Sequence, residues 1–203
     1  PGGITLNAGT IMLANEDANN AGLGTGIVTM NGGVITMRDD HATYNNFNAN
    51  LAVPAGATAR LNADSRVDMF GTLTGAGTLN FHVPDNRTTL FTNWSAFTGT
   101  INVLTDGNGG DLRMGSNYAF PGFPHAAVNL ADKVTAYYDG ILAEGAGTTI
   151  EIGELSGTAQ AVLLGGATGG RAITYRVGGK NTSASYAGSI GERNTGTATS
   201  YVK

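Results

Sequence analysis

ITLNAGTIML at residues 4–13 returns with few changes as VTMNGGVITM at residues 28–37. A gapless alignment of the two stretches, at an offset of 24 residues, places Asn7 on Asn31 and apolar residues on apolar residues. Each copy reads as a short strand, an Asn-small-Gly turn and a second short strand. The turn needs a positive φ angle, which Asn and Gly adopt at low cost.

The offset between the copies indicates a solenoid rather than an isolated hairpin. Repeats of about 20–25 residues that consist of short strands and glycine turns are typical of chains that stack one unit on the next. Equivalent residues then lie about 4.8 Å apart in a parallel ladder. We therefore expect one all-β domain over residues 1–203, a right-handed parallel β-helix of about nine rungs. No stretch has the apolar period of a helix.

The regular pattern weakens in the middle of the chain. Residues 106–125 read DGNGGDLRMGSNYAFPGFPH, which is too rich in Gly, Pro and Asn for an ordinary rung. We expect an irregular insertion around residues 85–147. In repeat proteins such insertions often carry the binding function.

Composition and charge exclude several classes of protein. The chain has 32 Gly, no Cys and a net charge of −4, and its 11 Lys and Arg residues are scattered, which argues against nucleic acid as a partner. No apolar run reaches the roughly 18 residues of a membrane span. The absence of cysteine is compatible with secretion. Because the sequence opens on Pro1 without an initiator Met, we expect a fragment of a larger secreted protein.

The stretch AGTIMLANEDANNAGLGTGIVTMNGGVITM (8–37) resembles the autotransporter-associated β-strand repeat. The likeness rests on the link at residues 21–26 (AGLGTG) and on the NGG turn, and residues 150–157 and 177–190 resemble later parts of such regions. This resemblance implies a right-handed parallel β-helix and an extracellular or cell-surface location in a bacterium. Such repeats occur in adhesin passengers and in accessory regions of secreted carbohydrate-active enzymes. The functional relative that this resemblance suggests is a β-helical carbohydrate-binding module attached to a xylanase-type enzyme.

Aromatic residues gather in the expected insertion. Eight of the 15 aromatic residues of the chain fall between residues 91 and 138. Pyranose rings stack on flat aromatic side chains, and Trp and Tyr add a polar tip. The alternative is that these aromatics, the phenylalanines above all, belong to the core. The predicted ligand-binding residues are the aromatics Trp94, Tyr118, Tyr137 and Tyr138, with Asp106, Asn108, Asp111 and Arg113 as hydrogen-bonding partners.

A glycine-rich loop offers a weak calcium candidate. Asp106, Asn108 and Asp111 stand in DGNGGD, where oxygen ligands at short spacing can bind Ca²⁺. The spacing lacks the twelfth-position glutamate of an EF-hand, so a solvated turn is the alternative. No other cofactor is expected.

The sequence lacks the residue patterns that catalysis on a β-helix requires. Asp39, Asp40 and His41 are adjacent in RDDHATY (38–44), and no second carboxylate cluster recurs at rung spacing. A glycosidase needs two carboxyl groups on opposite sides of a cleft. The histidines are too far apart in sequence for a short-spaced metal motif, and the Ser elbow G-x-S-x-G is absent. We expect a protein that is not an enzyme.

Three functions remain open. The first is a non-catalytic module that binds plant cell-wall polysaccharide, with a xylan-type β-glycan favoured, beside catalytic or surface domains of the same chain. It predicts an exposed Trp94 or Tyr137/Tyr138. The second is a structural stalk or passenger segment of an adhesin, which predicts that those aromatics are buried. The third, a β-helix lyase or hydrolase, requires carboxylates that converge in a groove.

Overall fold

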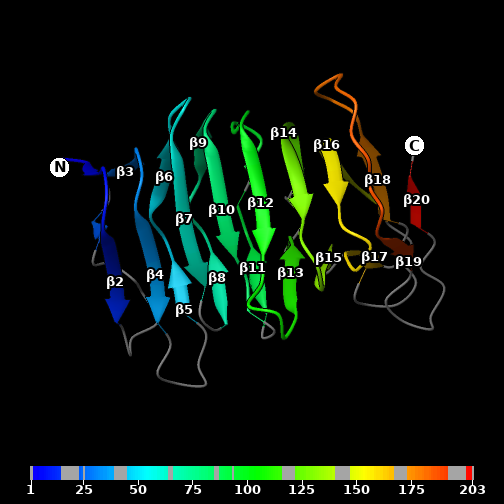
Figure 1. Cartoon of the computed structure of the whole chain (residues 1–203), viewed down its shortest axis with the longest axis horizontal. Helices are drawn as coiled ribbons and strands as arrows, with labels where there is room; N and C mark the ends of the chain where they lie inside the picture. The colour runs from blue at the N-terminus through cyan, green and yellow to red at the C-terminus, as the bar shows by residue number, and fades with distance from the viewer. Residues whose placement is uncertain are drawn as a thin grey trace.

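The computed structural model describes most of the chain. The described residues are 2–14, 23–24, 26–38, 45–63, 66–84, 87–92, 94–115, 122–139, 147–166, 173–191 and 200–202. Within these ranges the protein is an all-β parallel solenoid without an α-helix, as expected. Figure 1 shows the strands side by side along the long axis, with the two chain ends at opposite ends of the rod. Tyr118 and the cluster Asp39, Asp40 and His41 lie outside the described residues.

Three parallel sheets form the walls of the solenoid in the described part of the chain. The nine-stranded sheet consists of β2 (Thr10–Ala14), β4 (Val34–Arg38), β7 (Thr58–Ala63), β10 (Thr78–His82), β12 (Thr100–Leu104), β14 (Gly122–Leu130), β16 (Thr148–Gly157), β18 (Ile173–Val177) and β20 (Ser200–Val202). The seven-stranded sheet consists of β5 (Asn45–Phe47), β8 (Val67–Met69), β11 (Thr88–Leu90), β13 (Gly110–Met114), β15 (Val134–Tyr138), β17 (Val162–Gly166) and β19 (Ser189–Gly191). The four-stranded sheet consists of β1 (Ile4–Leu6), β3 (Ile27–Met30), β6 (Asn50–Val53) and β9 (Leu73–Gly75).

The number of complete turns is about six. The largest sheet has nine strands in the described residues, which matches the expected number of rungs. The rungs of β2 and β20 have no described strand in the seven-stranded sheet, however. Nine therefore overestimates the number of full turns that carry both large sheets.

The repeated ten residues pair in the register that their alignment predicts. Ile4 lies beside Val28 in one sheet and Ile11 lies beside Ile35 in another. At the turn between these strands, the Val34 N–H donates to the Gly9 carbonyl at 2.9 Å. The two copies are thus neighbouring rungs, stacked directly on each other.

Strict alternation of side chains builds the core. In β10 and β12 every second residue is buried, while the residues between them stay partly exposed. The inward residues stack from rung to rung, so that Leu61, Phe81 and Val103 form one fully buried column. Burial of such side chains contributes about 1.5–3 kcal/mol each, which makes this column a main source of stability.

Asparagines stack on the outer face of the nine-stranded sheet. The Asn102 side-chain amide donates to Asn80 at 2.9 Å, and Asn129 donates to Asn102 at 3.5 Å. Ser156 continues the row with a 3.3 Å hydrogen bond to Asn129. The ladder holds neighbouring rungs in register on the solvent side of the sheet.

The irregular insertion expected around residues 85–147 is wrong for the described part of that range. Strands β11 to β15 lie within it, and each pairs with a neighbour on both sides. The Gly- and Asn-rich stretch still contains a regular strand, because Asp111 and Arg113 face outward on β13 and alternate with the buried Leu112 and Met114. Charged residues can occupy a strand when they face outward and neutralise each other.

No described helix is long and apolar enough to cross a membrane.

Buried tyrosines near the C-terminal rungs predict a loss of stability at alkaline pH. Burial raises the pKa of Tyr175, whose hydroxyl donates to the Leu164 carbonyl at 2.6 Å, and it raises the pKa of Tyr186 to about 12. In the unfolded chain a tyrosine ionises near pH 10. Their stabilising contribution is therefore complete below about pH 10 and is lost as the pH rises from 10 toward 12.

We expect Tyr175→Phe to flatten this alkaline decline, as measured by urea unfolding from pH 7 to 12. At pH 7 the variant should be less stable by about 1 kcal/mol, because the Leu164 carbonyl loses its donor. An alkaline decline as steep as that of the wild type would contradict the assignment of Tyr175.

Candidate functional site

The outer face of the seven-stranded sheet carries most of the polar residues that the sequence singles out. Asp111 pairs in register with Thr135, and Arg113 with Tyr137. Because the residues between them point into the core, these four side chains point outward from β13 and β15. Two adjacent strands thus place Asp111, Arg113 and Tyr137 together, although Tyr137 is 26 residues from Asp111 in sequence.

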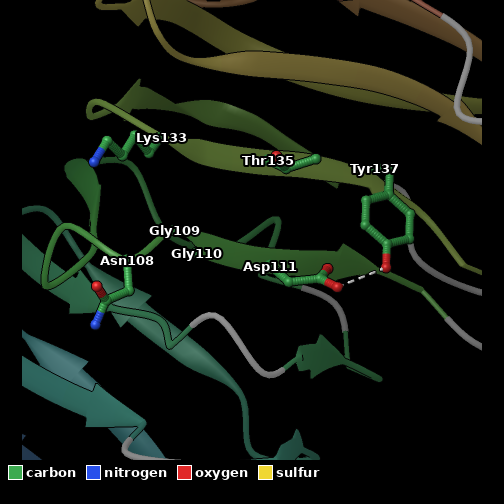
Figure 2. Close-up of a pocket in the computed structure, with 7 residues that line it drawn as sticks. All are labelled: Asn108, Gly109, Gly110, Asp111, Lys133, Thr135 and Tyr137. Carbon is green, nitrogen blue, oxygen red and sulfur yellow. Dashed lines mark hydrogen bonds between the residues drawn. The ribbon is translucent and has the colours of Figure 1, made fainter.

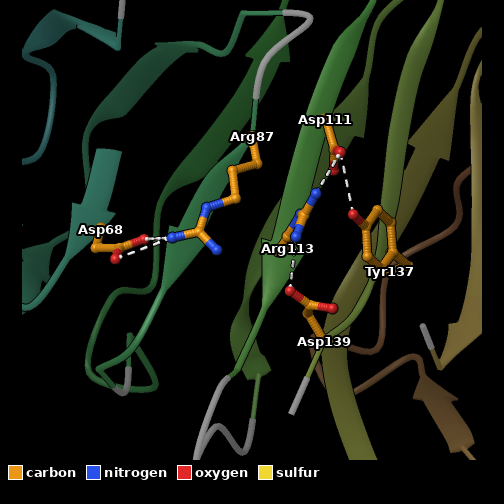
Figure 3. Close-up of polar contacts among 6 residues, drawn as sticks. All are labelled: Asp68, Arg87, Asp111, Arg113, Tyr137 and Asp139. Atoms are coloured by element: carbon orange, nitrogen blue, oxygen red, sulfur yellow. Dashed lines mark hydrogen bonds and ion pairs between the residues drawn. The ribbon is translucent and has the colours of Figure 1, made fainter. Parts of the chain in front are cut away.

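Arg113 is the centre of a hydrogen-bonded cluster (Figure 3). Its guanidinium donates to Asp111 at 3.2 Å and to Asp139 at 2.9 Å. The Tyr137 hydroxyl donates to the same Asp111 oxygen at 3.0 Å, and the guanidinium carbon lies 5.5 Å from the centre of the Tyr137 ring. A guanidinium at this distance from a ring gains a cation–π contact. The cluster therefore fixes the Asp111 carboxylate from two sides.

Burial and charge oppose each other at Arg113. Burial acts to lower the pKa of Arg113, but the hydrogen bonds and charges of Asp111 and Asp139 outweigh it, so the pKa is raised. The guanidinium is thus held in its charged form. Each of these three side chains keeps about a fifth of its surface exposed, so the ion pairs stand at the edge of the solvent.

A second ion pair lies on the same face (Figure 3). Arg87 precedes β11, one rung before β13, and Asp68 lies on β8, two rungs before β13. Arg87 Nη2 contacts both carboxylate oxygens of Asp68, at 2.8 and 3.1 Å. Burial raises the pKa of the Asp68 carboxyl, while the Arg87 guanidinium acts in the opposite direction. The outer face therefore carries acidic and basic side chains that compensate each other.

A cavity of about 270 Å³ opens beside the Arg113 cluster, where β13 and β15 begin (Figure 2). Its lining offers a carboxylate, an amide, an ammonium group and two hydroxyls within one small space. We call it the polar pocket. It is lined by Asn108, Gly109, Gly110, Asp111, Lys133, Thr135 and Tyr137.

Two features of the polar pocket are unusual. Lys133 has a φ angle of 61°, which a non-glycine residue adopts only at some cost. This backbone places its ammonium 2.7 Å from the Gly107 carbonyl. In addition, Asp111 Oδ1 is buried and accepts no hydrogen bond from any described residue. A buried oxygen without a donor is costly, so the wall of the polar pocket stores a free-energy cost at Asp111.

For the aromatic candidates that the structure describes, the expected exposure is wrong. Trp94, Tyr137 and Tyr138 are each at most 1% exposed. Trp94 lies inside the solenoid, where its Nε1 donates to the Gly71 carbonyl at 3.1 Å and its ring packs against Phe81 and Phe123. A ring that solvent cannot reach cannot stack on a sugar. Tyr137 nevertheless lines the polar pocket, and its hydroxyl is bonded to Asp111 there.

The three residues of the calcium candidate make contacts of their own with other protein groups. Asp106 Oδ1 accepts the Asn108 N–H at 3.3 Å, as in an ordinary turn, whereas Asp111 is held by Arg113 and Tyr137. The Lys133 ammonium binds the Gly107 carbonyl of this loop. Among the described residues, no three His, Asp or Glu side chains are placed to hold a metal ion.

Several residues of this face were not predicted from the sequence. Lys133, Thr135 and Asp139 enter the site only because β15 lies beside β13, a pairing that depends on the register. Phe70 and Phe91 were also missed as surface residues, although RVDMF (66–70) and RTTLF (87–91) repeat Arg and Phe at the same spacing. That short repeat is the signal that could have identified them.

The buried position of Trp94, the only tryptophan of the chain, is directly measurable. Its fluorescence should be shifted to the blue relative to the unfolded protein and should resist quenching by acrylamide. Trp94→Ala should destabilise the fold by about 3–5 kcal/mol, since it leaves a large cavity. Trp94→Phe should cost less, because it keeps most of the packing and loses the bond to Gly71. Unfolding followed by circular dichroism measures both, and a fully quenchable Trp94 would contradict the structure.

Comparison with known proteins adds no relative. No protein-family model matches the chain, and no curated protein and no solved structure is significantly similar to it. The chain can be assigned to the architecture of the parallel β-solenoid, and its function must be inferred from its own residues.

Proposed function

We propose that the protein is a non-catalytic carbohydrate-binding module that uses the outer face of the seven-stranded sheet. The observation that carries the proposal is the polar pocket, which unites Asn108, Asp111 and Tyr137, three residues that the sequence singles out for this role. Amide, carboxylate and hydroxyl groups on a fixed scaffold are the partners that sugar hydroxyls need. The favoured ligand is a plant cell-wall β-glycan of the xylan type, in keeping with the repeat that the sequence resembles.

The size and charge of the pocket agree with a sugar. At about 270 Å³ it lies just below the roughly 300–1,000 Å³ of typical small-molecule pockets, so it suits one unit of a longer chain. Asp111 in the pocket and its neighbour Asp139 both pair with Arg113, and Asp68 in an earlier rung pairs with Arg87. A face whose charges are paired, with no excess of basic groups in these pairs, favours a neutral polymer over an anion such as nucleic acid.

The same pairing supports a binding role rather than catalysis. A glycosidase requires one carboxyl group as acid and another as base or nucleophile, on opposite sides of the bond to be broken. Here Asp111 and Asp139 share the guanidinium of Arg113, and Asp68 is bound by Arg87. These carboxylates act as ion-pair partners that stabilise the outer face of the sheet.

The second candidate is a structural segment that holds other domains apart. It is favoured by the burial of Trp94, Tyr137 and Tyr138 and by the regular asparagine ladder, because a bare spacer needs rigidity and no ligand. Membership of a larger secreted or surface protein of a bacterium is part of both proposals.

Affinity electrophoresis with soluble xylan, β-glucan, mannan and pectin tests the proposal. We expect one glycan to retard the wild type, and Asn108→Ala and Lys133→Asn to reduce this retardation. Asn is chosen at position 133 because it tolerates the positive φ angle. Arg60→Ala, at an exposed position of the nine-stranded sheet, is the matched control and should bind as the wild type does. No retardation by any of the four glycans would overturn the binding function and favour the structural segment.

A further inference from the structure

Two phenylalanines form an aromatic pair on the same outer face, at the opposite ends of the strands from the polar pocket. The rings of Phe70 and Phe91 are stacked, with centroids 4.6 Å apart and planes inclined by 25°. Phe70 is 39% exposed, which is unusual for a large apolar side chain, and Phe91 is partly exposed. Neither belongs to the core.

The backbone fixes the place of both rings. The Phe70 N–H donates to the Phe47 carbonyl at 2.8 Å, and the Phe91 N–H donates to the Met69 carbonyl at 2.9 Å. Both residues thus continue the parallel ladder just beyond β8 and β11. Because side chains alternate along a strand, Phe70 lies on the same face as Asp68, and Phe91 lies on the same face as Thr89. The backbone hydrogen bonds and the mutual stacking fix the positions of both rings, so little conformational entropy is lost when a ligand binds to them.

The surroundings of the pair are polar. Asn48 and Thr72 are exposed near Phe70, and the Thr72 hydroxyl donates to Asn50 at 2.8 Å. An apolar protein partner would need a wider apolar surface than two rings, since specific protein interfaces bury far more area. A pyranose fits better, because it has an apolar face for the ring and hydroxyls at its rim for the amide and hydroxyl groups nearby.

The distance to the polar pocket follows from the register. Phe91 lies one rung from β13 and, along the strand direction, about four residues beyond Asp111. With about 4.8 Å per rung and 3.3 Å per residue, the two sites are on the order of 14 Å apart. One extended oligosaccharide can reach both, whereas a single sugar cannot.

We propose that Phe70 and Phe91 form a stacking platform for the sugar rings of a neutral, extended glycan whose chain also enters the polar pocket. The proposal rests on the carbohydrate-binding function above and adds a second contact site to it. The open side of Phe70 supports one sugar ring. The polar pocket binds the hydroxyls of another unit farther along the chain.

The test measures binding of neutral xylan and of xylan oligosaccharides of increasing length by titration calorimetry. Phe70→Ala should weaken binding about tenfold, the equivalent of losing one aromatic contact, and Phe91→Ala should have a similar effect. Phe70→Trp should keep the binding, and its added, exposed indole should change fluorescence when glycan is present. Long oligosaccharides should bind better than a disaccharide, because only they span both sites.

Two controls separate this proposal from the one it rests on. Met12→Ala removes another exposed apolar side chain, 57% exposed, and should leave binding unchanged. Circular dichroism checks that every variant folds. If Asn108→Ala and Lys133→Asn weaken binding while Phe70→Ala and Phe91→Ala do not, the platform is overturned and the binding function stands. If the wild type binds none of the glycans, both are overturned.

Discussion

The parallel backbone ladder is the constraint on which the rest of this protein depends. It stacks successive rungs at a spacing of about 4.8 Å, so every side chain meets its equivalent in the next rung. Inside, this demands apolar residues that fit one another, as in the column of Leu61, Phe81 and Val103. On the outer faces, it favours side chains that can form hydrogen bonds with their equivalents in the next rung, as Asn80 and Asn102 do.

The same ladder limits the kind of site that the solenoid can hold. Outward side chains of neighbouring rungs are close enough to form ion pairs, as Asp68 and Arg87 do, so the outer face becomes a polar strip of paired charges. Outward side chains stand in rows at fixed intervals, which suits contact with several units of a linear polymer better than enclosure of one small substrate. The stacked pair Phe70 and Phe91 and the polar pocket follow this logic, because both lie on the outer face of one sheet and are separated by strand and rung spacings.

The sequence alone determined the architecture. The repeat of residues 4–13 at residues 28–37 predicted a stacked parallel ladder, and the strands pair in that register. It did so because a positive-φ turn and alternating apolar residues are local properties that can be read from neighbouring letters. The polar, glycine-rich context also singled out Asn108, Asp111 and Arg113, and the structure places the first two in the lining of the polar pocket and Arg113 beside Asp111.

Only the tertiary structure decided which side chains reach solvent. Trp94 was predicted as an exposed ligand-binding residue, yet the chain folds it into the solenoid, where the Gly71 carbonyl accepts a hydrogen bond from its Nε1–H. Tyr137 joined Asp111 because β15 pairs with β13, and Phe70 stacked on its partner in the next rung because β11 pairs with β8. Burial and contact across rungs depend on the registry of residues some 20 or more positions apart, and no local pattern of letters carries that information.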